Sequence, residues 1–91
     1  MDGSWRGQSG ATVCRITDIS WDGCFLETLS SPSVGEQTIV TVPAGDRTIE
    51  ISGQIVYVER GLGIALKFDK LTGDQIDALT GLLGEPPASA R

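Results

Sequence analysis

The stretch TIEISGQIVYVERGLGIALKF, residues 48–68, contains two runs in which apolar and polar residues alternate, with a break at Glu59-Arg60-Gly61. The apolar positions of the first run are Ile49, Ile51, Ile55 and Tyr57, and those of the second are Leu62, Ile64, Leu66 and Phe68. Alternation with a period of two is typical of strands that bury one face. The stretch therefore predicts an antiparallel hairpin of strands 48–58 and 62–68. We expect Gly53 to mark a bend or bulge in the longer strand.

Three more strands are predicted before this hairpin. Residues 11–19 are rich in β-branched side chains, and an extended pattern resumes over residues 24–29 after a break at Ser20-Trp21-Asp22-Gly23. This arrangement predicts a second hairpin with a short loop. A further β-branched run, residues 38–42, ends at Pro43 and predicts one more strand.

A helix is predicted after the strands, because the apolar period changes at Thr72. Thr72-x-x-Gln75 resembles a capping box. The apolar residues that follow form a stripe at helical spacing, namely Ile76, Leu79, Leu82 and Leu83. Gly84 is placed to cap the C-terminal end, and Pro86-Pro87 prevents the helix from continuing.

The order of these elements predicts the fold class. Five antiparallel strands at short spacing and one amphipathic helix indicate an all-β fold with one C-terminal helix, a small antiparallel β-barrel of five to six strands capped by an α-helix. Residues 11–83 would form this domain. The glycine-rich and polar residues 1–10 predict a flexible N-terminal arm, and residues 84–91 predict a disordered tail.

The composition excludes several classes of function. The 91 residues suit one domain, and their 7 basic and 12 acidic side chains give a net charge of −5, which disfavours binding to nucleic acid polymers. No apolar run is long enough for a membrane span, so we expect a cytoplasmic protein without membrane contact. The chain has no histidine and no Cys-x-x-Cys spacing, so we predict no metal site, no cofactor and no enzymatic activity.

The two cysteines, Cys14 and Cys24, are predicted to be free and buried. If Ile19 faces Gly23 across the first turn, Cys14 faces Thr28. The two sulfurs are then not opposed, as a disulfide between neighbouring strands would require. Free cysteines are among the most frequently buried residues.

Asp18-Ile19-Ser20-Trp21-Asp22-Gly23 matches the Asp/Asn-x-Ser-x-x-Gly signature of PilZ domains, and the order of predicted elements agrees with that family. The chain resembles the family from about Ala11 to Leu83. The resemblance implies a non-enzymatic receptor for the bacterial second messenger cyclic di-GMP. It also implies that Asp18 accepts hydrogen bonds from the guanine edge and that Ser20 forms a hydrogen bond with the ligand. Gly23 would permit a tight turn or a close approach of the backbone to the ligand.

The other half of that family's site is an Arg-x-x-x-Arg segment ahead of the barrel, whose guanidinium groups bind phosphates. The motif is incomplete here, because Arg6-Gly7-Gln8-Ser9-Gly10 has glycine where the second arginine should stand. Arg6 is therefore the one arginine assigned to the site. Two readings stay open: a cyclic di-GMP receptor that acts on a regulatory protein partner, or a degenerate domain that contacts proteins without binding nucleotide.

The family also places a further strand between its arginines and the position of Asp18. Without that strand the sheet would keep an unpaired edge. Because a second copy of the chain could satisfy such an edge, we expect a homodimer.

Overall fold

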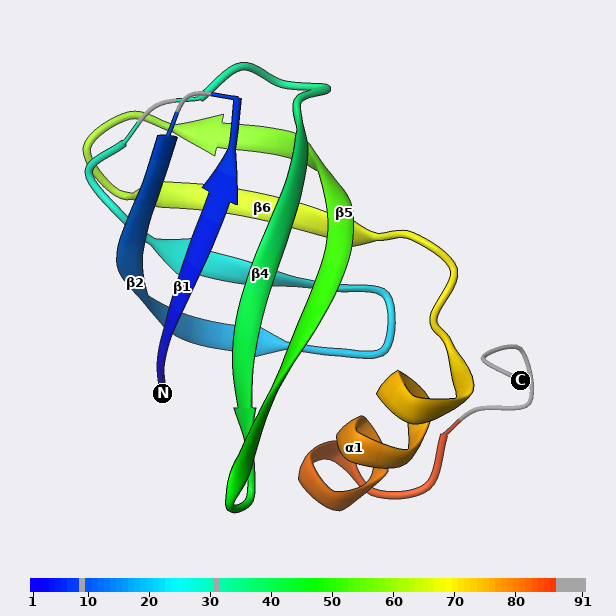
Figure 1. Ribbon diagram of the computed structural model, residues 1–91. Helices are drawn as coiled ribbons and strands as arrows, with labels where there is room; N and C mark the ends of the chain where they lie inside the picture. The colour runs from blue at the N-terminus through cyan, green and yellow to red at the C-terminus, as the bar shows by residue number, and fades with distance from the viewer. Residues whose placement is uncertain (9, 31, 87–91) are drawn as a thin grey trace.

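Six antiparallel strands close into a barrel, and one helix follows them (Figure 1). The computed structural model describes residues 1–8, 10–30 and 32–86. The elements are β1 (Asp2–Gly7), β2 (Gly10–Ile19), β3 (Gly23–Glu27), β4 (Gln37–Ala44), β5 (Arg47–Glu59), β6 (Gly63–Phe68) and α1 (Gly73–Leu83). Around the barrel the spatial order is β1-β2-β3-β6-β5-β4. The predicted fold class, a small antiparallel barrel with one C-terminal helix, is confirmed.

The first residues of the chain form β1, so our prediction of a flexible arm over residues 1–10 is wrong. β1 pairs with β2 on one side and with β4 on the other. The reason is Trp5, whose side chain is only 2% exposed and belongs to the core. An indole buries enough apolar surface to hold a segment that is otherwise glycine and polar residues.

Closure of the barrel by β1 also removes the basis of the predicted homodimer. Each described strand has a neighbour on both sides, so the barrel presents no unpaired edge to a second copy. β1 occupies the edge that we expected to remain unpaired, although it contains Arg6 and so does not lie between this arginine and Asp18. Most of the predicted disordered tail falls on residues 87–91, which lie outside the described part of the chain.

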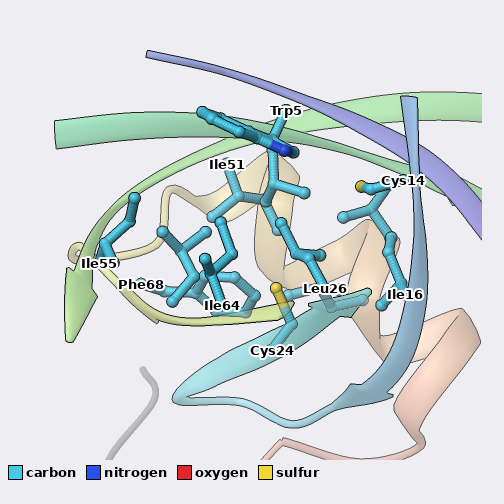
Figure 2. Packing of buried hydrophobic residues seen from close by; sticks show 13 residues of the cluster. Trp5, Cys14, Ile16, Cys24, Leu26, Ile51, Ile55, Ile64 and Phe68 are labelled. Carbon is cyan, nitrogen blue, oxygen red and sulfur yellow. The ribbon is translucent and has the colours of Figure 1, made fainter. Parts of the chain in front are cut away.

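The core fills the barrel with apolar side chains at alternate strand positions (Figure 2). The fully buried ones include Leu26, Val40, Val42, Ile51, Ile55, Ile64 and Leu79. In β6 the alternate residues Ile64, Leu66 and Phe68 point into the barrel, as predicted. Leu62 instead lies before the strand, in the turn, and is 51% exposed.

A β-bulge interrupts β2 close to its C-terminal end. Ile16 pairs with Leu26, but Asp18 pairs with Phe25, which leaves Thr17 as the extra residue. Ile19 consequently faces Cys24, and our expected pairing of Ile19 with Gly23 is wrong by one position.

A second bulge, in β5, lies at Val56 and not at Gly53. The register shifts between Ile55 and Tyr57, whereas Gly53 pairs regularly on both sides. The shift turns Tyr57 outward, where it is 52% exposed, although the sequence pattern grouped it with the inward isoleucines. Both bulges lie in the same part of the barrel, because Asp18 faces Phe25, Phe25 faces Ala65, and Ala65 faces Tyr57.

The helix α1 covers part of the barrel through Leu79, which is fully buried, and contacts β4 and β5. Its predicted capping box is present: the Thr72 hydroxyl accepts from the Gln75 amide, and the Gln75 side chain accepts from the Thr72 amide. Gln75 Nε2 also donates to the carbonyl of Glu50 at 2.8 Å, which attaches the helix to β5. The predicted C-cap at Gly84 is present as well, with a φ of 90°. Within the described residues no helix is long and apolar enough to cross a membrane.

Candidate ligand-binding site

The turn between β2 and β3 is held by hydrogen bonds of Ser20. The Ser20 amide donates to the Gly23 carbonyl at 2.8 Å, and the Asp22 amide donates to the Ser20 hydroxyl at 3.3 Å. The Asp22 carbonyl accepts from the Phe68 amide at 2.8 Å, which fixes the turn to the end of β6. The signature residues therefore stand on a rigid turn, not on a loose loop.

A pocket of about 690 Å³ lies beside this turn, on the outer face of β2, β3, β6 and β5. Its lining brings together three of the four residues predicted from the sequence: Asp18, Ser20 and Gly23. The remaining lining residues are Asp22, Cys24, Phe25, Val56, Ala65, Leu66 and Lys67. An open pocket with an apolar floor and a few polar groups at one end is typical of a small-molecule site.

Asp18 reaches this pocket because of the bulge at Thr17. Cys14 and Ile16 are buried inside the barrel, and strict alternation would point Asp18 inward with them. The extra residue reverses the alternation, so that Asp18 is exposed on the outer face opposite Phe25. Bulges commonly redirect a side chain next to a functional site.

Gly23 is required by the close approach of β3 to β6. A β-carbon at this position would overlap the carbonyl oxygen of Leu66, a backbone atom that has no freedom to move aside. The glycine of the signature thus has a packing role in the barrel wall. It also keeps the pocket floor free of a side chain between Ser20 and Lys67.

Lys67 lines the pocket as well, although the sequence analysis did not identify it as a site residue. It faces Gly23 on β3 and Gln54 on β5, on the outer side of β6. The signal was present in the alternation of residues 62–68, which points Lys67 outward. What sequence could not supply was the β3–β6 register that sets it beside the signature turn.

The structure does not bring Arg6 to this pocket. Arg6 faces Ala11 on β2, and the seven positions from Ala11 to Asp18 correspond to roughly 23 Å of extended strand. Its guanidinium instead forms an ion pair with Glu50 at 2.7 Å. The hydrogen bond between them raises the pKa of Arg6 and lowers the pKa of Glu50.

We therefore expect Arg6→Gln to leave ligand binding at the pocket unchanged. The substitution breaks an exposed ion pair, which contributes little to stability, and removes no group that lines the pocket. Calorimetric titration of the variant beside the unmodified chain checks this expectation. A clear loss of affinity would show that Arg6 leaves Glu50 to bind the ligand.

Both cysteines are free and buried, as predicted. Cys24 lies behind the pocket, with its side chain among the core residues (Figure 2). Burial raises the pKa of Cys24 to about 12, with smaller contributions from Cys14 and Asp18. Burial also raises the pKa of Cys14. Both thiols are thus poor nucleophiles in the folded chain, because the thiolate is the reactive form.

We expect neither thiol to react with iodoacetamide in the folded chain below pH 9.0, the ordinary thiol value, while both react after unfolding in urea. Above that pH the unfolded Cys24 thiol loses its proton and the folded one keeps it, so the free energy of unfolding falls as the pH rises from 9.0 towards about 12. Mass spectrometry of the labelled chain measures the first effect, and urea titrations across this range measure the second. Rapid labelling of the folded chain would contradict the burial.

Among the described residues no group of three or more histidine, cysteine, aspartate or glutamate side chains is arranged to hold a metal ion. The ligand that suits the pocket is therefore inferred from the polar side-chain groups that line it. They are the carboxylates of Asp18 and Asp22, the hydroxyl of Ser20 and the ammonium of Lys67.

Comparison with known proteins agrees with this architecture. A family model described as PilZ domain matches residues 2–85, which extends from β1 to the end of α1. A search of curated proteins finds no match. The family match includes β1, the strand that the sequence pattern alone did not reveal. Because the match covers nearly the whole chain, from the first strand of the barrel to its terminal helix, the chain belongs to the PilZ family.

Proposed function

We propose that this chain is a non-enzymatic signalling module of the cytoplasm that binds cyclic di-GMP in the pocket beside the β2–β3 turn. PilZ domains are a family of non-catalytic binding domains associated with this ligand. The observation that carries the proposal is the outward turn of Asp18 at the bulge, into one pocket with Ser20 and Gly23. Without the bulge this carboxylate would lie inside the barrel.

The chemistry of the pocket suits a guanine base. An ionised carboxylate is a strong acceptor, and the guanine edge offers the N1–H and an amino group side by side. The outer face next to Asp18 is formed by Phe25, Ala65 and Val56, which provide an apolar surface for the flat face of the base. A base bound there would meet the Ser20 hydroxyl at the rim of the pocket.

Calorimetric titration with cyclic di-GMP and with cyclic di-AMP tests the proposal. Adenine has no N1–H and no amino group at the position where guanine pairs with a carboxylate, so we expect saturable binding of cyclic di-GMP and much weaker binding of cyclic di-AMP. Equal affinity for both dinucleotides would contradict recognition by Asp18. No heat with either ligand at high concentration would remove the receptor function.

A degenerate domain that contacts proteins without nucleotide is the second candidate. It is favoured by the charge of the pocket lining, where Asp18 and Asp22 stand against the single cation Lys67. Next to the pocket, Val56 and Tyr57 are about half exposed and offer apolar contact area to a regulatory protein. The titration separates the two candidates, since this one predicts no nucleotide binding.

A further inference from the structure

Lys67 occupies a defined place in the barrel wall beside the signature turn. It faces Gly23 across the β3–β6 pair, whereas Asp18 belongs to the neighbouring outward row with Phe25 and Ala65. One inward row, which contains Leu66 and Cys24, separates these two outward rows. Lys67 is therefore two residues along the strand direction and two strand spacings across the sheet from Asp18, which corresponds to roughly 12 Å. Gly23, opposite Lys67, leaves the outer face of β3 beside the lysine without a side chain.

Among the described residues, the Lys67 ammonium forms no ion pair and no side-chain hydrogen bond. The one ion pair within the described part of the chain joins Arg6 to Glu50. Lys67 is also the one cation among the residues that line the pocket. An ammonium group that is free, exposed and part of the same pocket lining as Asp18 is available for an anionic part of the ligand.

We propose that Lys67 binds a phosphate of the ligand and supplies the positive charge that the pocket lacks without an arginine pair. This inference rests on the proposed function, because it presupposes a phosphorylated guanine ligand. Asp18 then holds the base, and Lys67 holds the phosphate at the other end of the same pocket. A lysine binds phosphate as a point charge and not as a bidentate fork, so the contact contributes attraction with little geometric selectivity.

A contact between Lys67 and a phosphate depends on the salt concentration, whereas a purely structural role of the lysine does not. An ion pair at an exposed site weakens as salt screens it. The difference in affinity between the unmodified chain and a variant without the charge therefore shrinks as the salt concentration rises. A side chain that only shapes the pocket would contribute the same factor at every salt concentration.

The test is a titration with cyclic di-GMP at low and at high sodium chloride, for the unmodified chain, Lys67→Gln, Lys67→Arg and the control Lys70→Gln. Lys70 is also an exposed lysine near the end of β6, but it does not line the pocket. We expect Lys67→Gln to raise the Kd about 10-fold at low salt, which is the loss of one charge-assisted contact, and by much less at high salt. Lys67→Arg and Lys70→Gln should stay close to the unmodified chain.

The outcomes distinguish this inference from the proposed function. If the unmodified chain does not bind the ligand, both fail. If it binds and Lys67→Gln binds equally well, or is weakened by the same factor at both salt concentrations, the phosphate role of Lys67 is wrong while the receptor function stands. Thermal melting of each variant verifies that the barrel remains folded.

Discussion

Asp18→Ala is expected to weaken the binding of cyclic di-GMP by about 100-fold or more. A carboxylate that accepts two hydrogen bonds from the guanine edge forms charge-assisted contacts of about 1.5–3 kcal/mol each, and about 1.4 kcal/mol corresponds to a factor of ten. Because Asp18 lies exposed on the outer face, its removal should not change the melting temperature appreciably. Calorimetric titration gives the affinity, and a thermal scan of the same sample gives the stability.

Two further variants make this prediction specific. Asp18→Asn keeps one carbonyl acceptor at the bulge and should retain more affinity than the alanine variant, in agreement with the Asp/Asn alternative of the family signature. Asp22→Ala removes a second carboxylate of the same pocket. Its side chain has no assigned contact with the base, so removal of its negative charge should preserve or improve the binding of an anionic ligand. Equal losses in Asp18→Ala and Asp22→Ala would argue against a dedicated base contact.

Gly23→Ala is expected to lower the free energy of unfolding by about 3 kcal/mol, near the upper end of the usual cost of overpacking. The new β-carbon would overlap the Leu66 carbonyl oxygen, a backbone atom of β6, which is paired on both sides by β3 and β5. Separation of β3 from β6 to relieve the overlap would weaken the pairing that also positions Lys67. Urea-induced unfolding followed by tryptophan fluorescence measures the loss.

The matched control is Gly81→Ala, the same substitution in α1. A β-carbon at Gly81 meets no atom within 4 Å, and alanine in a helix is more stable than glycine by about 0.5–1 kcal/mol. This variant should therefore unfold at a higher urea concentration than the unmodified chain. A Gly23→Ala variant as stable as Gly81→Ala would show that the close approach of β3 to β6 is not needed for the fold.

The local patterns of the sequence were sufficient to predict most of the barrel. Strands 48–58 and 62–68 alternate strongly, and short turns restrict such strands to antiparallel neighbours. The capping box at Thr72 and the C-cap at Gly84 depend on contacts within a few residues, and both predictions are confirmed. β1 was missed because its burial depends on Trp5 packing against strands far away in the sequence.

The site could be predicted only in part, because the positions of Asp18 and Lys67 depend on how neighbouring strands are aligned. The signature identified Asp18, Ser20 and Gly23, which the structure brings into one pocket. No local pattern indicated the bulge at Thr17 that turns Asp18 outward, or the β3–β6 pairing that adds Lys67. Arg6 was assigned because it resembles one arginine of the family's Arg-x-x-x-Arg segment, whereas β1 places it opposite Ala11, at the other end of β2 from Asp18.

A ¹H–¹⁵N correlation spectrum of the chain, recorded during titration with cyclic di-GMP, shows where the ligand binds. We predict saturable shifts for the amides around the pocket, at residues 18–25 and 65–67. The amides of a second hollow, on the surface of α1 between Gly73 and Pro86, should not move and serve as an internal control. A spectrum that is unchanged at high ligand concentration, or shifts confined to α1, would contradict the assignment of this pocket.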